Sequence, residues 1–194
     1  MTRIASSICL MAFIATTSTP ATIYAQERDA IIEQLSRGVK ARKIDVEELK
    51  NSVRNKISVE ARPGSAPSNV QSSIPDLGKE LPSVSFEIYF DYDSAAINPQ
   101  SIPTLIQLGQ ALKDERLSKF RFLIAGHTDA AGQREYNRAL SERRADAVRT
   151  FLVATFGIPY ERVSPIGFGM EQLKDPKNPL SGVNRRVEVI NIGS

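Results

Sequence analysis

Apolar and polar residues repeat with two different periods along this chain, and the repeats divide it into short elements. Residues 84–90, "VSFEIYF", carry an apolar side chain at every second position, which predicts a strand with one face in a core. Residues 120–126, "FRFLIAG", are almost continuously apolar and predict a central strand covered on both faces. Residues 162–169 and 185–192 predict two further strands.

Two helical patterns lie between these strands. Asn98 followed by Pro99 is typical of a helix start, and the helix it opens is predicted to run to residue 112. Its predicted buried stripe consists of Ile102, Leu105, Ile106, Gly109 and Leu112. The second helix is predicted over residues 133–156 and ends before Gly157.

The order strand, helix, strand, helix, strand, strand predicts the fold of residues 84–194. Strands joined through helices favour an α/β domain of two layers, with a mixed sheet and helices packed on one of its faces. Residues 170–183 form a long loop before the last strand, and their role cannot be deduced from the sequence.

The segment before this domain has a different character. Residues 26–60 contain two short helical patterns, and Asp45 with Glu48 resembles a capping box that opens the second helix. These residues form either a satellite hairpin or a helix docked on the domain, or else a partner-binding or self-associating segment. Residues 61–83 are rich in proline and serine, so we expect a linker without regular structure.

The first 25 residues resemble a secretory signal peptide. Arg3 gives a basic start, residues 4–14 are mostly apolar, and Ala25 is the expected cleavage point. Cys9, which is the only cysteine, lies in this leader, and Ser6 and Ile8 do not fit the motif of a lipid-modified cysteine. We therefore expect a secreted protein without disulfides.

Charge and residue usage disfavour several classes of function. The formal net charge is +3, and basic and acidic residues are interspersed, so a nucleic-acid partner is not expected. His127 is the only histidine, and no second acidic residue lies at ligand spacing from it. We therefore expect no catalytic triad, no metal site and no cofactor, and His127 is expected to pack at a strand end or to bond a loop.

One arginine interrupts the apolar face of the second helix. Helical steps of three or four connect Asn137, Leu140, Arg144 and Val148, so Arg144 points in the direction of the core. A charge in that position needs an acidic partner, and Asp129 at the end of the central strand is the candidate. The pair either forms a ligand site, because ligands of open sheets gather at strand ends, or is a purely structural ion pair.

Four separated blocks carry a resemblance to a known family. "FDYDSAAI", "GHTDAAGQREYNRALSERRADAV", "VSPIGFG" and "NRRVEV" resemble, in order and spacing, the OmpA-like peptidoglycan-binding domain family. The resemblance implies that Asp129 and Arg144 grip the diaminopimelate of the peptidoglycan stem peptide. It also implies that Asn137 and Arg185 border the pocket, as does Asp93, where relatives carry asparagine or aspartate. Thr128, next to Asp129 at the end of the central strand, is expected to line the same opening.

The resemblance therefore implies a non-catalytic protein that tethers the cell wall to the envelope by binding peptidoglycan. Residues 26–83 contain neither a long apolar helix nor a series of alternating strands, so we expect a freestanding periplasmic member without a barrel, associated with the outer membrane at most through partners. The alternative is an envelope scaffold whose residues 26–60 bind a partner, with the Asp129–Arg144 pair purely structural.

Overall fold

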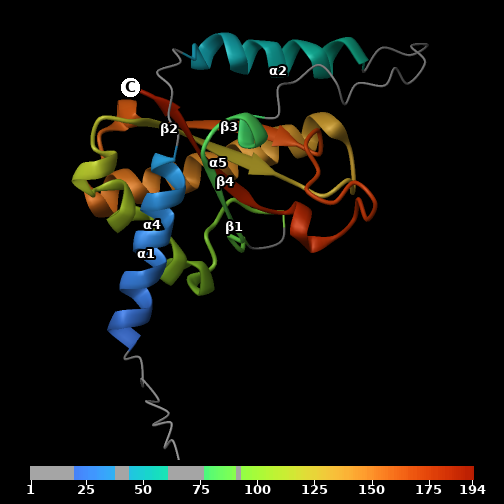
Figure 1. The fold of residues 1–194 in the computed structure, drawn as a ribbon. Helices are drawn as coiled ribbons and strands as arrows, with labels where there is room; N and C mark the ends of the chain where they lie inside the picture. The colour runs from blue at the N-terminus through green and yellow to red at the C-terminus, as the bar shows by residue number, and fades with distance from the viewer. Residues whose placement is uncertain (1–19, 38–43, 61–76, 91–92) are drawn as a thin grey trace, which may run out of the picture.

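A computed structural model of the protein describes residues 20–37, 44–60, 77–90 and 93–194 (Figure 1). Most of the predicted leader, Cys9 included, and residues 61–76 of the predicted linker lie outside this described part. The helices are α1 Pro20–Ser36, α2 Val46–Glu60, α3 Leu77–Glu80, α4 Ile102–Leu112 and α5 Arg134–Phe156. The strands are β1 Ser83–Phe86, β2 Arg121–His127, β3 Val163–Gly169 and β4 Val187–Gly193. None of the helices in the described ranges is long and apolar enough to cross a membrane.

The four strands form one mixed sheet in the order β1-β4-β2-β3. β2 and β3 are parallel, and α5 connects them, whereas β4 is antiparallel to both β1 and β2. The predicted α/β fold class with a mixed sheet is therefore confirmed. The first strand is shorter than the alternation of residues 84–90 predicts, because pairing with β4 ends at Phe86 and Phe90 makes only an isolated bridge to Ile97.

Helices α1, α4 and α5 cover one face of the sheet. Their apolar side chains share a core with Phe122 and Ile124 of β2 and Val189 of β4. The predicted cap of the first helix is confirmed, because the side chain of Asn98 accepts a hydrogen bond from the backbone of Gln100. A 3-10 turn, η2 (Pro99–Ser101), precedes α4. Leu105, Gly109 and Leu112 are buried as predicted, and Leu108 and Ala111 are buried as well. Ile102 is only half-buried, and the prediction that Ile106 is buried is wrong, because this residue is 38% exposed.

The first half of α5 lies unusually close to the sheet. A Cβ atom added at Gly126 would lie 2.1 Å from the carbonyl oxygen of Ser141, and one at Gly167 would lie 2.5 Å from that of Arg138. Only glycine allows backbone to approach backbone so closely. This contact fixes the helix across the ends of β2 and β3, where the predicted site residues lie.

The second face of the sheet is covered as well. Val53 of α2 and Leu77 of α3 share a core with Leu123, Ala125 and Ile190. In Figure 1, α2 (teal) lies above the sheet and α1 (blue) below it. The prediction that the helices of residues 84–194 pack on one face is confirmed, because α4 and α5 share the first core, and the second face is covered by α2 and α3 from the segment before the domain, since β2, β3 and β4 carry apolar side chains on both faces.

Of two predictions for the segment before the domain, one is partly wrong and the other is supported. The prediction that residues 61–83 contain no regular structure is wrong for its last part, because Leu77–Glu80 form α3 and Ser83 begins β1. The predicted cap of the second helix is supported, because a carboxylate oxygen of Asp45 accepts hydrogen bonds from the backbone N–H groups of Glu47 and Glu48 (2.9 and 3.1 Å).

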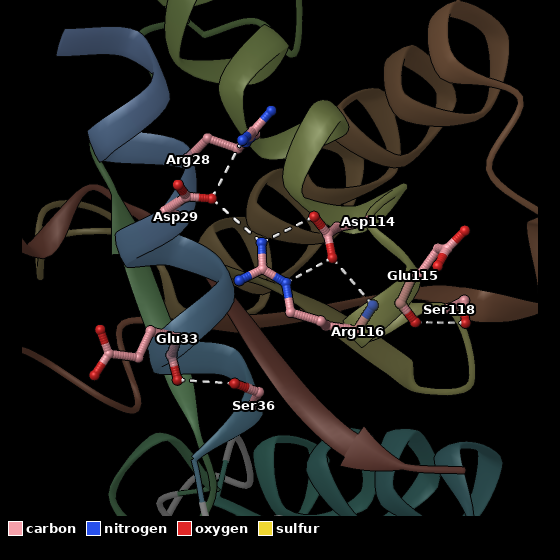
Figure 2. Close-up of polar contacts among 8 residues, drawn as sticks. All are labelled: Arg28, Asp29, Glu33, Ser36, Asp114, Glu115, Arg116 and Ser118. Carbon is pink, nitrogen blue, oxygen red and sulfur yellow. Dashed lines mark hydrogen bonds and ion pairs between the residues drawn. The ribbon is translucent and has the colours of Figure 1, made fainter. Parts of the chain in front are cut away.

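Helix α1 packs into the same body as the sheet. Ile31, Ile32 and Leu35 are buried in the core beside α4. The side-chain amide of the buried Asn191 donates to the carbonyl oxygen of Leu35 (2.8 Å). Figure 2 shows Arg116 between Asp29 of α1 (3.2 Å) and Asp114 (2.8 Å). These exposed ion pairs contribute little free energy, so the apolar contacts hold α1 in place.

Candidate functional site

A cleft of about 720 Å³ opens where β2 ends and α5 begins. The structure brings all six residues predicted from the sequence to its walls, although they come from four separate segments of the chain. They are Asp93, Thr128, Asp129, Asn137, Arg144 and Arg185.

The turn after β2 holds Thr128 and Asp129 in a fixed position. The backbone N–H of Thr128 donates to the carbonyl oxygen of Gly169 (2.8 Å), and that of Ala130 donates to Pro179 (2.9 Å). A carboxylate oxygen of Asp129 accepts a hydrogen bond from the N–H of Ala131 (3.1 Å). The buried side chain of Asn137 donates to the carbonyl oxygen of Ala131 (2.6 Å). The amide nitrogen of Asn137 is therefore a support of the turn, not a free donor.

Arg144 reaches the cleft from α5. Its neighbours on the same helical face, Asn137, Leu140 and Val148, are buried as predicted. The Nε atom of Arg144 donates to the carbonyl oxygen of Ser94 (3.0 Å), and the guanidinium lies over the ring of Phe90, 4.9 Å from its centroid. Among the described residues, this hydrogen bond is the only one that Arg144 makes. Its two terminal amino groups, Nη1 and Nη2, therefore remain available toward the cleft.

Neighbouring groups shift the pKa of Arg144 in opposite directions. Burial lowers the pKa of Arg144, and the neighbouring charge of Arg185 lowers it further. The carboxylates of Asp129 and Asp93 raise it again. Because the ordinary pKa of arginine is very high, the side chain of Arg144 stays cationic. Its positive charge would stabilise the anionic group of a ligand beside it.

Asp129 is paired with a different arginine from the one expected. Its Oδ2 atom lies 2.7 Å from Nη1 of Arg185, and the side chains are 16% and 54% exposed. Asp129 and Arg144, both in the described part of the chain, form no direct ion pair, so a structural Asp129–Arg144 bridge is corrected. The reason is directional: Nε of Arg144 donates to the carbonyl oxygen of Ser94, whereas Nη1 of Arg185 lies beside the carboxylate of Asp129.

Asp93 lies on the loop that supplies the partner of Arg144. Its backbone adopts a left-handed conformation (φ 52°), which aspartate tolerates better than most residues. The next residue, Ser94, offers the carbonyl oxygen that accepts from Arg144. Asp93 therefore contributes an exposed carboxylate at the rim of the cleft.

Several residues of the site were not predicted from the sequence. Tyr136 and Leu140 line the cleft at four-residue steps before Arg144, a spacing that could have revealed them. Phe90 and Ser94 contact Arg144 from a loop about 50 residues earlier, and no local pattern indicates that contact. The buried side chain of Asn184 donates to the carbonyl oxygens of Asn178 and Pro179 and accepts from the N–H of Asp175, so it fixes the loop 170–183 beside the turn.

His127 lies on the opposite face of β2 from α5, outside this arrangement. Its ring stacks on Phe168 with centroids 5.5 Å apart, and its Nε2 atom lies 3.6 Å from a carboxylate oxygen of Glu188. Burial would raise the pKa of Glu188, but hydrogen bonds from His127 and Ser83 and the charge of Arg186 outweigh it and lower the pKa to about 2. Within the described ranges, no group of three or more histidine, cysteine or acidic residues is arranged to hold a metal ion.

Comparison with known proteins gives relatives for this domain. The chain is 39% identical over 107 residues to the peptidoglycan-associated lipoprotein of Brucella melitensis, covering 54% of this chain and 62% of that protein. It is 33% identical over 111 residues to outer membrane porin F of Pseudomonas aeruginosa, covering 56% of this chain and 31% of the porin. The chain thus spans less than two thirds of the length of either relative.

Comparison with solved structures gives two further matches. The peptidoglycan-associated lipoprotein from Burkholderia pseudomallei is 28% identical, with a TM-score of 0.46, over 63% of this chain and 99% of that one. The OmpA-like domain of FopA1 from Francisella tularensis is 25% identical, with a TM-score of 0.48, over 55% of this chain and 70% of that one.

The OmpA family profile matches residues 89–186, which is half of the chain. The matched residues run from the loop before α4 to the second arginine of "NRRVEV". They include all six of the predicted site residues that line the cleft. The chain belongs to the OmpA family.

Proposed function

We propose that this protein binds peptidoglycan without catalysis, through the diaminopimelate of the stem peptide, and thereby holds the cell wall to the envelope. The observation that carries the proposal is the arrangement of Arg144 and Asp129. A cation with two available donors and a nearly buried carboxylate line one cleft without neutralising each other directly. The side chain of diaminopimelate ends in a carbon with both an ammonium and a carboxylate, which is the complementary arrangement.

Arg144 is suited to the carboxylate of that group. Because its Nε atom is held by Ser94 and its plane lies over Phe90, the guanidinium has one orientation before a ligand arrives. The two terminal amino groups can then donate parallel hydrogen bonds to both carboxylate oxygens. Each such charge-assisted hydrogen bond contributes about 1.5–3 kcal/mol.

Asp129 is suited to the ammonium. Its carboxylate accepts hydrogen bonds from Ala131 and Arg185, which leaves two of the roughly four lone-pair sites of a carboxylate. Arg185 is half exposed and can shift toward solvent as an ammonium enters. In the free protein, the guanidinium of Arg185 therefore takes the place that the proposal assigns to the ligand's ammonium.

The remaining walls fit the rest of a stem peptide. Tyr136 and Leu140 offer apolar surface to the methylene groups of diaminopimelate. The hydroxyl of Thr128 is buried and makes no hydrogen bond within the described residues, so it is a donor or acceptor for the ligand. A single stem peptide would be held weakly by these contacts, and the repeats of a wall polymer would prolong attachment.

The names of the relatives support this proposal, since several are peptidoglycan-associated lipoproteins. We extend it to a periplasmic location, in accord with the signal peptide expected from residues 1–25. The alternative of an envelope scaffold that binds a partner through residues 26–60 receives less support. Ile31, Ile32, Leu35 and Val53, the apolar residues that such a partner would use, are already buried against the sheet.

Co-sedimentation with insoluble peptidoglycan tests the proposal. We expect the full chain to pellet with the wall, and Asp129→Ala and Arg144→Ala to remain largely in solution while retaining the circular dichroism spectrum of the folded protein. Arg143→Ala is the matched control, because Arg143 is the exposed neighbour of Arg144 on the same helix. Equal pelleting of the Arg143 and Arg144 variants would contradict the proposal. Release of soluble wall fragments during the assay would contradict its non-catalytic part.

A further inference from the structure

A second cleft, of about 460 Å³, adjoins the one that we assign to diaminopimelate. It shares Phe90, Arg144 and Arg185 with the first cleft, so those side chains form a common wall. The other side is built by the segment before Phe90 and by the end of the long loop. Its residues are Glu87, Tyr89, Ser181, Gly182 and Val183, together with Ile88.

Tyr89 is the most distinctive residue of this second cleft. Its side chain is 52% exposed, although its backbone is fixed on both sides. The backbone N–H of Tyr89 donates to the hydroxyl of the buried Ser101 (2.7 Å), and its carbonyl oxygen accepts from the N–H of Asn98 (2.9 Å). The ring is thus presented to solvent from a rigid support, which is typical of a ligand-stacking position.

The opposite wall is also held in place. The hydroxyl of Ser181 accepts from the N–H of Val183, and Val183 is 40% exposed. The same loop is bound to the turn of Asp129 through the hydrogen bond from Ala130 to Pro179. The two clefts therefore have a fixed spacing, and one polymer can occupy both without rearrangement of the loop.

Apart from Arg144 and Arg185 on the wall shared with the first cleft, the polar groups of the second cleft are suited to a ligand that carries hydroxyl groups. The Tyr89 hydroxyl donates to the carboxylate of Glu87 (3.1 Å), which retains further lone pairs for ligand hydroxyls. A sugar ring combines an apolar C–H face, which matches Tyr89 and Val183, with hydroxyl edges, which match Glu87 and Ser181.

We propose that the second cleft is a saccharide subsite, in which Tyr89 stacks on a sugar of the glycan strand whose stem peptide occupies the first cleft. This inference rests on the proposed function. It assigns to the site a second ligand class, the amino-sugar backbone of the wall, in addition to the peptide.

Calorimetric titration with two matched ligands tests the inference. One is the tripeptide L-Ala–γ-D-Glu–diaminopimelate, and the other is the same tripeptide joined to its disaccharide. We expect the full-length wild type to bind the disaccharide-tripeptide about tenfold more tightly, a gain of about 1.4 kcal/mol. Tyr89→Ala is expected to abolish this gain, whereas Tyr89→Phe keeps most of it because the ring remains. Tyr160→Ala, which removes an exposed tyrosine outside both clefts, is expected to keep all of it.

The outcomes separate the subsite from the proposed function. If the wild type binds the tripeptide but gains nothing from the disaccharide, or if Tyr89→Ala keeps the gain, the saccharide subsite is overturned while the peptide site stands. If the wild type binds neither ligand, the proposed function fails and the subsite fails with it. Binding of the disaccharide-tripeptide alone would overturn the assignment of the first cleft to the stem peptide, and the inference would fail in the form stated here.

Discussion

Two arginines of this protein, Arg144 and Arg162, have similar surroundings and different sets of partners. Both side chains are partly buried, and burial lowers the pKa of each. Both guanidinium groups lie over a phenylalanine ring, Arg144 over Phe90 at 4.9 Å and Arg162 over Phe122 at 5.7 Å. Burial and aromatic stacking alone therefore do not distinguish a binding arginine from a structural one.

The hydrogen bonds make the distinction. Arg162 donates from all three of its nitrogens, to the carbonyl oxygens of Phe120 (3.0 Å), Leu112 (3.1 Å) and Leu117 (2.7 Å). Arg144 donates from Nε alone. Arg162 joins the end of α4 to the start of β2 and is saturated by the protein, whereas Arg144 is oriented by the protein and has donors left for a ligand.

Removing Arg162 is expected to have the largest effect on stability. Arg162→Ala removes one hydrogen bond from each of three carbonyl groups, of which that of Leu117 keeps the bond from the N–H of Phe120, so we expect the free energy of unfolding to fall by about 3 kcal/mol, measured by urea denaturation. Any protein that remains folded should bind peptidoglycan normally. A decrease below about 1 kcal/mol, or a specific loss of binding, would show that the two arginines do not divide their roles in this way.

The Arg144→Lys substitution tests the binding role of Arg144, as Arg162→Ala tests the structural role of Arg162. Lysine keeps the positive charge but cannot donate two parallel hydrogen bonds to one carboxylate, so we expect affinity for the tripeptide to fall about tenfold. Stability should change by about 1 kcal/mol or less, because one hydrogen bond to Ser94 is at stake. Calorimetry and urea denaturation on the same samples check both numbers. A large loss of stability with unchanged affinity would assign Arg144 a structural role.

We expect the stability of the fold to decrease at low pH because of Glu188, which lies on the face of the sheet opposite α5. Its pKa in the folded protein is about 2, below the ordinary carboxyl value of 4.5, so its contribution to stability is complete above pH 4.5 and is lost as the pH falls toward 2. Across that interval, the free energy of unfolding should fall more steeply for the wild type than for Glu188→Gln. Parallel curves for the two proteins would contradict this assignment.

Much of the architecture could be predicted from the sequence because each of those elements depends on local pattern. The cap at Asn98, the end of α5 at Gly157 and the central strand β2 follow from side-chain types within a few positions. The sequence predicted that the central strand is covered on both faces, but not which helices cover the second face, since α2 and α3 meet β2 and β4 across large separations in sequence.

The candidate site shows the same division. The helical spacing from Asn137 to Arg144 predicted that these two side chains lie on the same side of the helix, and the structure places both at the cleft. The ionic partners did not follow from spacing, because Arg185 reaches Asp129 from a position 56 residues away. The carbonyl oxygen of Ser94, which orients Arg144, is a backbone group, so the pattern of side chains along the sequence does not indicate this contact.

The central claim is that Arg144 binds the carboxylate that distinguishes diaminopimelate from lysine. Calorimetry on a thermodynamic cycle tests it, with wild type and Arg144→Gln each titrated with the diaminopimelate tripeptide and with its lysine analogue, which keeps the ammonium and lacks that carboxylate. We expect the wild type to bind the diaminopimelate tripeptide about 10- to 100-fold more tightly than the lysine analogue. Arg144→Gln is expected to bind both peptides with affinities within about threefold of each other. An Arg144→Gln variant that keeps the full preference of the wild type would contradict the central claim.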